Sequence, residues 1–315
     1  MEGEFLEFVR QRGLLPGNAS HPVGIGDDAA VLRWGGGEDF VVCSDLISDD
    51  VDFILAEIEP ERIGRKSVAI NLSDLAAMAC QPKAAILTFL LPRQTGIELD
   101  ALELAKQLYL GAERIATEFD CPIVGGDTNT WEGKLAISVT LLGSCTTGRP
   151  LRRDAAQVGD AICVTGPLGG SLLGHHFDFT PRVREALWLN EHCELHAGMD
   201  ISDGLALDLS RLSRASQVGA ELFAEQIPIS NAAVEMSKTS GKTPLVHALG
   251  DGEDFELLLT LPQEELAKFQ VLQTAGEVPS GIELHVLGKI VSGNVLTLIE
   301  NDGQRRPLDS IGFLH

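Results

Sequence analysis

The chain has 315 residues, of which 44% are hydrophobic and 33 are glycine, so it is long enough for two ordinary domains and too apolar to be disordered. Its 46 Asp and Glu against 24 Lys and Arg give a net charge of −22, which argues against a nucleic-acid partner. No apolar run approaches the roughly 18 residues of a membrane span, and the acidic, amphipathic start is unlike a signal peptide, so we expect a cytoplasmic protein without a membrane partner.

The acidic composition also bears on how the chain could handle phosphate. A protein that binds polyanions needs positive charge, and the 24 Lys and Arg are too few to dominate its surface. Metal ions are the natural supply of the missing charge. The six cysteines contain no CxxC pair, which argues against structural zinc and against a disulfide framework, so we expect reduced and mostly buried thiols.

Strand and helix patterns alternate in the first half of the chain. FVVCSDLI is apolar and rich in β-branched residues, which predicts a strand that delivers Ser44 and Asp45 at its end. Two longer segments have the amphipathic period of helices, and the first of them begins and ends with proline. We therefore expect, in chain order, a helix at 1–14, a strand at 40–47, a helix at 60–82, a strand at 84–92, a helix at 97–119, and strands in 121–128 and 135–145.

The local composition of the chain changes near residue 148. A Gly-Pro pair and three arginines precede a new apolar strand pattern, as is typical of the start of a second domain. The second half places one acidic loop before a helix within 199–216 and another before a strand within 248–262. These alternations, without a short repeat, predict an α/β (α+β) architecture with domains at 1–147 and 148–315.

Five short segments place Asp beside Gly or Ser at the edge of an apolar element. Each alone could be a helix cap or a turn. Magnesium, however, requires oxygen ligands that converge from different parts of a chain, and glycine lets backbone N–H groups approach phosphate. The close like-charge pairs Asp27–Asp28 and Asp200–Asp203 also favour a bound cation. The segments are GIGDDAAVL (24–32), CSDLI (43–47), NLSDLAAM (71–78), GGDTN (125–129) and DISDG (200–204).

Two other segments partly match the sequence motifs of nucleotide-binding loops. SGKT at 240–243 resembles the end of a P-loop, but the GxxxxGK pattern needs glycine where Met236 stands. TGPLGGSLLG at 165–174 follows a predicted strand but lacks the GxGxxG spacing. We reject the first and interpret the second as a packing turn.

The ordered set GIGDDAAVL, SD, NLSDLAAM, GGDT, DISDG and GEDFEL resembles the thiamine-monophosphate kinase family. That family is related to aminoimidazole ribonucleotide synthetase, selenophosphate synthetase and HypE. The resemblance spans nearly the whole chain and implies a two-domain, PurM-like architecture, with a mixed N-terminal sheet and an α/β C-terminal domain. It also implies a homodimer that pairs through N-terminal strands.

The implied reaction is the magnesium-dependent, in-line transfer of a phosphoryl group from ATP to thiamine monophosphate, with no phosphoenzyme. Of the residues that the resemblance implies, Asp45, Asp127 and Asp203 are expected to be catalytic. The implied metal ligands are Asp27, Ser44, Asp45, Asp74, Asp127, Asp200 and Asp203. The implied ATP contacts are Tyr109, Gly126, Asp127, Arg153 and Ser202.

The acceptor side departs from the family pattern at one position. The resemblance implies substrate contacts from Glu253 and Phe313, and a His-Phe pair is usual where this chain has Asp52 and Phe53. An ionised Asp52 would repel a substrate phosphate unless a metal ion intervenes. Asp52 therefore keeps two alternatives open: an ATP-dependent enzyme of the same superfamily with another small phosphorylated acceptor, and a nucleotide-binding regulator without turnover.

Overall fold

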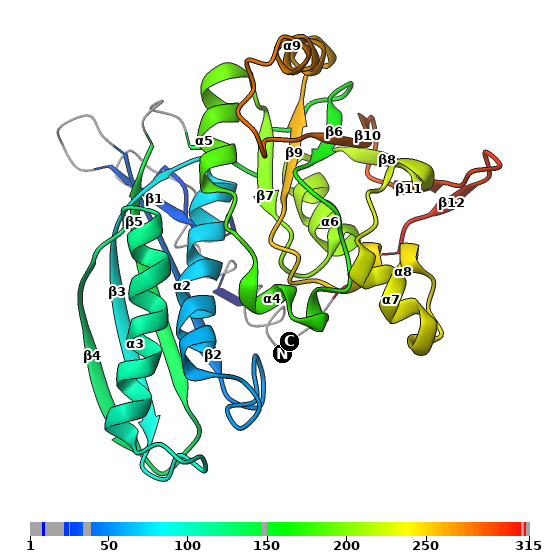
Figure 1. The fold of residues 1–315 in the computed structure, drawn as a ribbon. Helices are drawn as coiled ribbons and strands as arrows, with labels where there is room; N and C mark the ends of the chain where they lie inside the picture. The colour runs from blue at the N-terminus through cyan, green and yellow to red at the C-terminus, as the bar shows by residue number, and fades with distance from the viewer. Residues whose placement is uncertain are drawn as a thin grey trace.

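The computed structural model describes residues 8–9, 22–24, 26–33, 39–145, 150–309 and 312. Within these ranges two sheets stand side by side, one built by the first half of the chain and one by the second (Figure 1). Most of the helix expected at 1–14 lies outside the described residues. In the described part of the chain, no helix combines the length and apolar character that a bilayer span requires.

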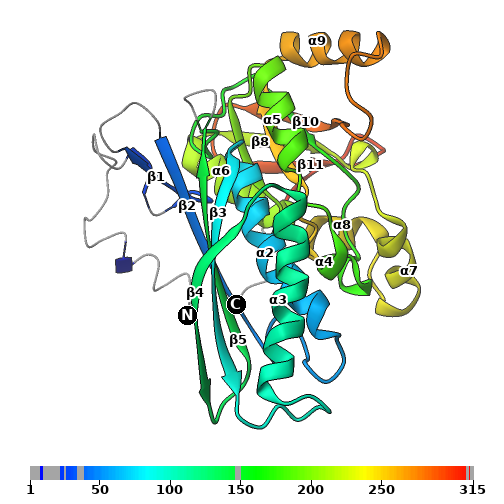
Figure 2. The same ribbon diagram turned by 60° about the vertical axis from the view of Figure 1, so that its left-hand side comes forward.

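The first sheet is mixed, in the order β1–β2–β5–β3–β4, with only β3 and β4 parallel to each other. Helices α2 and α3 pack over one face of it (Figure 2). Its elements are β1 (Ala30–Arg33), β2 (Asp39–Ser48), α2 (Pro60–Ala77), β3 (Gln81–Pro92), α3 (Ala101–Glu118), β4 (Ile123–Trp131) and β5 (Ala136–Ser144).

The second sheet has the order β12–β11–β8–β10–β6–β9–β7. Its strands are β6 (Ala161–Val164), β7 (Ala197–Asp200), β8 (Gly219–Phe223), β9 (Leu257–Leu261), β10 (His285–Val291), β11 (Leu296–Ile299) and β12 (Arg305–Pro307). The helices of this half are α4 (His175–Asp178), α5 (Val183–His192), α6 (Leu205–Ser216), α7 (Asn231–Ser240), α8 (Pro244–Gly250) and α9 (Gln263–Thr274), with short 3-10 turns at Ser171–Leu173 and Ala224–Gln226.

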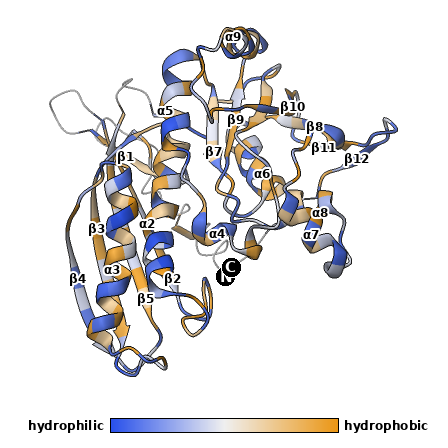
Figure 3. Cartoon of the chain, in the orientation of Figure 1, coloured by the Kyte–Doolittle hydropathy of each residue, from blue (hydrophilic) through white to orange (hydrophobic). Residues whose placement is uncertain are grey.

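Most predicted elements of the first half are confirmed, although several ends differ. The helix expected at 60–82 ends at Ala77, and the strand expected at 84–92 begins at Gln81. The helix expected from 97 begins at Ala101, because the Asp100 side chain accepts a hydrogen bond from the Glu103 N–H and caps the first turn. Strand β4 continues beyond the GGD motif to Trp131, since its backbone stays in register with β3. Figure 3 shows polar and apolar residues side by side along α3, as expected for a helix with one face in solvent.

Helix α2 is the central element of the molecule. Thirteen of its 18 residues are buried, because it packs against α3 and β2 on one side and against α4, α5 and β7 on the other. The backbones of α2 and α3 are in direct contact at Gly64, because a Cβ there would lie only 1.9 Å from the Leu108 carbonyl oxygen. The apolar core around Leu72 continues into the second half at Leu257 and Phe269, so α2 joins the two sheets through one core.

Candidate active site

Three carboxylates from distant parts of the chain meet beside the C-terminal end of α2. Asp28 lies in the bend before β1, Asp74 in the last turn of α2, and Asp200 at the end of β7. Each offers an oxygen atom within 4.8 Å of the other two. Asp200 also accepts a hydrogen bond of 2.6 Å from the Ser73 hydroxyl, which ties the second sheet to α2. Both halves of the chain therefore build this cluster.

Asp45 extends the cluster along β2. Its side chain shares a hydrogen bond with Asp74, and its backbone N–H donates to the Asn71 side chain at 3.2 Å. The alternation of a strand explains the placement, because odd-numbered residues of β2 face α2. For the same reason the neighbouring Ser44 points to the opposite face, where its hydroxyl bonds the Val139 carbonyl and Thr140. The Ser44 side chain is thus separated from the cluster that it was expected to join.

The carboxylates carry more negative charge than their surroundings can stabilise. Burial raises the pKa of Asp74 and Asp200 well above the usual range, and neighbouring carboxylates raise both further. Burial also raises the pKa of Asp45 to about 6, although its hydrogen bond with Asp74 opposes the shift. The pKa of Asp27 rises to about 7 through burial and the charge of Asp28. A cation bound here would relieve this repulsion.

Arg153 is the cation that reaches this cluster from the segment after residue 150. Its guanidinium forms a two-pronged ion pair with Asp28, with Nε 2.9 Å from Oδ2. Its backbone N–H donates to Asp27 Oδ2 at 3.2 Å, and Asp27 Oδ1 accepts the Asp28 N–H at 3.0 Å. Asp27 therefore braces the turn, while Asp28 is the member of the pair that joins Asp74 and Asp200.

The DISDG motif forms a loop whose conformation is held by a buried acid. Asp208, in the first turn of α6, accepts hydrogen bonds from the N–H groups of Asp203 and Gly204 at 2.9 and 3.1 Å. Arg211 pairs with both Asp203 and Asp208. The carbonyl of Ser202 accepts the Glu253 N–H at 2.6 Å, which connects this loop to the GEDFEL segment. Asp203 thus lies in the loop that follows Asp200, but its carboxylate is paired with Arg211.

The residues expected at the acceptor meet around a lysine that sequence reasoning missed. Lys66, on α2, donates to Glu253 Oε1 at 2.6 Å and to the Asp52 carbonyl at 3.3 Å. The Asp52 carboxylate accepts the Ser48 N–H at 2.7 Å, so it caps the turn after β2. Phe313, the third residue expected here, lies outside the described residues.

Gly126, Asp127 and Tyr109 were expected to contact nucleotide or metal, but in a single copy of the chain they lie away from the carboxylate cluster. Asp45 pairs with Val139, Val139 with Leu87 and Leu87 with Gly126 across the sheet. These three strand spacings separate Gly126 and its neighbour Asp127 from β2 by about 14 Å. Tyr109 is on α3, beside Glu113, and is 38% exposed. A single chain does not bring Asp127 into the cluster.

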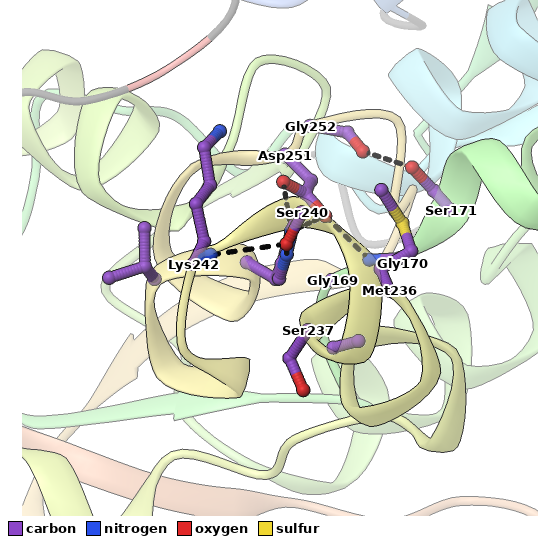
Figure 4. Close-up of polar contacts among 12 residues, drawn as sticks. Gly169, Gly170, Ser171, Met236, Ser237, Ser240, Lys242, Asp251 and Gly252 are labelled. Atoms are coloured by element: carbon purple, nitrogen blue, oxygen red, sulfur yellow. Dashed lines mark hydrogen bonds and ion pairs between the residues drawn. The ribbon is translucent and has the colours of Figure 1, made fainter.

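The SGKT segment connects α7 to α8. Ser240 ends α7, Thr243 caps the N-terminus of α8, and the Ser240 hydroxyl accepts the Lys242 N–H at 3.2 Å (Figure 4). That hydroxyl also bonds His247 Nε2 at 2.7 Å, and His247 Nδ1 lies 2.9 Å from the Asp251 carboxylate. The segment therefore fixes the loop that leads into Glu253.

The donor set fits a hard divalent cation. Asp28, Asp74, Asp200 and Asp45 offer only carboxylate oxygens, which are the ligands that magnesium prefers. The raised pKa values reflect how unfavourable it is to hold these groups together in ionised form without a cation. Residues of both halves would thus share the same ion or ions.

Comparisons with known proteins find relatives that cover both halves of the chain. Residues 26–145 match the family model described as AIR synthase related protein, N-terminal domain, and residues 166–301 match its C-terminal domain. A thiamine-monophosphate kinase of Rhodopirellula baltica is 44% identical over 299 residues, covering 92% of this chain and 90% of that protein. One of Aquifex aeolicus is 32% identical, covering 85% and 90%.

Solved structures show the same fold. The structure titled AaThiL complexed with AMPPCP and TMP superposes with a TM-score of 0.81 at 26% identity, covering 99% of this chain and 96% of that one. The HypE–HypF complex gives a TM-score of 0.75 at 18% identity, covering 97% and 99%. The second likeness concerns the fold alone.

Proposed function

The chain belongs to the thiamine-monophosphate kinase family, and we propose that it transfers the terminal phosphoryl group of ATP to thiamine monophosphate, giving ADP and thiamine diphosphate. The observation that carries the proposal is the meeting of Asp28, Asp74 and Asp200 from both halves of the chain. This meeting supplies an anionic site for metal ions in a family whose named substrate is a phosphate ester. The relative titled as a complex with AMPPCP and TMP supports the same pair of substrates.

Asp28, Asp74, Asp200 and Asp45 would hold magnesium. When bound, the ions neutralise the phosphate oxygens of both substrates and let two anions approach each other. Arg153, at the edge of this cluster, supplies a guanidinium that can pair with nucleotide phosphate oxygens. The acceptor oxygen is already anionic, so the protein needs no strong general base. Its residues act by orienting the two phosphates in line.

The proposed homodimer would explain why Asp127 lies apart from the cluster. The even-numbered residues of β2 and β3 form the sheet face away from α2, and Leu46 and Ile86 on that face are 65% and 39% exposed. An apolar sheet face of this kind suits pairing with a second copy. We propose that Asp127 of one copy completes the nucleotide site of the other.

The activity itself is tested by incubating purified protein with magnesium, ATP and thiamine monophosphate. We expect thiamine diphosphate and ADP in equal amounts, because direct transfer consumes one ATP per product. Chromatographic separation of both products measures this ratio. ADP without thiamine diphosphate would point to another acceptor, and intact ATP binding without turnover would support the regulator.

The shared site is tested by co-expressing two inactive variants, Asp28→Asn and Asp127→Asn. Random pairing makes half of the dimers mixed, and each mixed dimer has one intact site, so about a quarter of the wild-type activity should return. Co-expression of Asp28→Asn with Asp74→Asn is the control, because every mixed site then lacks one carboxylate. Equal activity in both mixtures would refute the shared site.

A further inference from the structure

Lys66 is among the largest fully buried side chains of the described residues, although lysine is among the residue types least often buried. It lies in the first half of α2, and its ammonium group contacts two segments from different parts of the chain. Glu253 Oε1 of the second half lies 2.6 Å away, and the Asp52 carbonyl of the first half lies 3.3 Å away. The Phe177 ring is a third neighbour, with its centroid 5.1 Å from the ammonium nitrogen.

Burying an ammonium group is unfavourable unless it is paired and hydrogen-bonded, so these contacts are a requirement of the fold at this point. Glu253 is different, because its side chain remains 29% exposed while that of Lys66 is 1% exposed. The pair is therefore open to a ligand on the carboxylate side only. Lys66 contacts the Glu253 carboxylate from its buried side.

The loop that carries Glu253 has a conformation that needs external support. Glu253 and Phe255 both have positive φ, +53° and +51°, which is costly for residues with a side chain. Figure 4 shows part of the support from the second half: Gly170 N–H donates to Asp251 at 2.9 Å, and the Ser171 hydroxyl donates to the Gly252 carbonyl at 2.5 Å. Lys66 supplies the support from the first half.

Helix α2 carries both Lys66 and Asp74. Eight residues at 1.5 Å per residue place their Cα atoms about 12 Å apart along a rigid helix. One helix thus sets the separation between the carboxylates that would hold metal and the loop that presents Glu253. A displacement of that loop by about 1 Å would alter the alignment of two reacting phosphates.

We propose that Lys66 is a positioning residue for the phosphoryl acceptor, acting through Glu253 and through the carbonyl of Asp52. This inference rests on the proposed function, since the acceptor in question is thiamine monophosphate. Lys66 itself is 1% exposed and lies behind Glu253, so the proposal gives it no direct contact with nucleotide or metal. Its loss should therefore weaken the acceptor site and leave the nucleotide site intact.

The test compares Lys66→Met with wild type in steady-state kinetics and in calorimetric binding of thiamine monophosphate in the presence of AMPPCP. We expect the KM and the Kd for thiamine monophosphate to rise at least tenfold, while the KM for ATP changes less than twofold. Arg62→Met is the matched control. Arg62 also lies on α2 and near the Phe177 ring, but it pairs with Asp178, on α4, and not with Glu253.

A double mutant separates action through Glu253 from an independent effect. If Lys66 acts through the carboxylate, Lys66→Met combined with Glu253→Gln should be no worse than twofold below Glu253→Gln alone. Multiplying effects, or equal losses for both substrates, would overturn the proposal. If Lys66→Met does not fold, Lys66→Gln, which keeps a hydrogen-bond donor, replaces it in the same measurements.

The result for wild type separates this inference from the proposed function. A wild-type protein that forms no thiamine diphosphate but binds thiamine monophosphate contradicts the function, while the Kd of Lys66→Met still decides the role of Lys66. A wild-type protein that forms product while Lys66→Met keeps its KM contradicts only the inference. Absence of wild-type binding overturns both.

Discussion

Asp28→Asn should lower phosphoryl transfer by about 10²- to 10³-fold, whereas Asp27→Asn should lower it less than tenfold. The two residues are adjacent and chemically identical, but only Asp28 has an oxygen within 4.8 Å of both Asp74 and Asp200. Asp27 accepts hydrogen bonds from the backbone N–H groups of Asp28 and Arg153 instead. An asparagine side chain can keep only one of those bonds through its carbonyl oxygen, because they fall on two different carboxylate oxygens, but no ligand of the cluster is removed.

The measurement is kcat at saturating substrates, repeated across magnesium concentrations. Asp28→Asn should also need more magnesium for half-maximal rate, because one anionic ligand is gone. Asp154→Asn is a matched control, since Asp154 is exposed, follows Arg153 directly in the chain and pairs with Arg152. Equal losses at positions 27 and 28 would contradict the assignment of Asp28 as the ligand of this pair.

Without metal, the protein should become less stable as pH rises from about 5 to 8. The pKa values of Asp45 and Asp27 are raised from 3.8 to about 6 and about 7, so the native state keeps protons that the unfolded state has already released. Stability therefore falls as pH rises, beginning above the unfolded pKa and ending above the folded one. Asp74 and Asp200 act in the same direction, while the lowered pKa of buried His176 opposes them.

For Asp45 alone, the shift from 3.8 to about 6 corresponds to about 3 kcal/mol in total, since one pKa unit is about 1.4 kcal/mol, and roughly half of that is lost between pH 5 and 8. Thermal unfolding in EDTA at several pH values should thus show Tm falling by several degrees. Magnesium should reverse most of the fall, since it binds the ionised carboxylates of the native state. A Tm that rises between pH 5 and 8 in EDTA would contradict the raised pKa values.

The elements of the first half could be predicted because local signals and tertiary structure agree. Proline marks the start of α2, and apolar residues precede and follow Ser44 and Asp45 in β2. Helix α8, by contrast, has no counterpart among the predicted elements, and its last residues fall in the segment expected as an acidic loop. Its seven residues are fixed by the cap at Thr243 and by packing against α7, and so short a helix has little periodicity of its own.

The motifs that contribute to the site could be predicted from the sequence, but which residue of each motif joins the carboxylate cluster could not. Asp27 and Asp28 are equivalent in sequence, and Arg153, far away along the chain, contacts each of them in a different way. That Ser44 and Asp45 point to opposite faces of the sheet could have been predicted, since they are consecutive residues of one strand. The burial of Lys66 could not be predicted, because a lysine on a helix is normally exposed. It lies on the buried face of α2 with three other polar residues, Ser67, Asn71 and Ser73.

The core that α2 shares between the two sheets limits how the molecule can move. Hinge-like opening between the halves would expose apolar residues such as Leu72, Leu257 and Phe269 to water at once. We therefore expect substrate entry and product release to depend on local rearrangement of loops and not on separation of two lobes. Turnover would then be set by how readily small segments at the rim loosen while the body stays rigid.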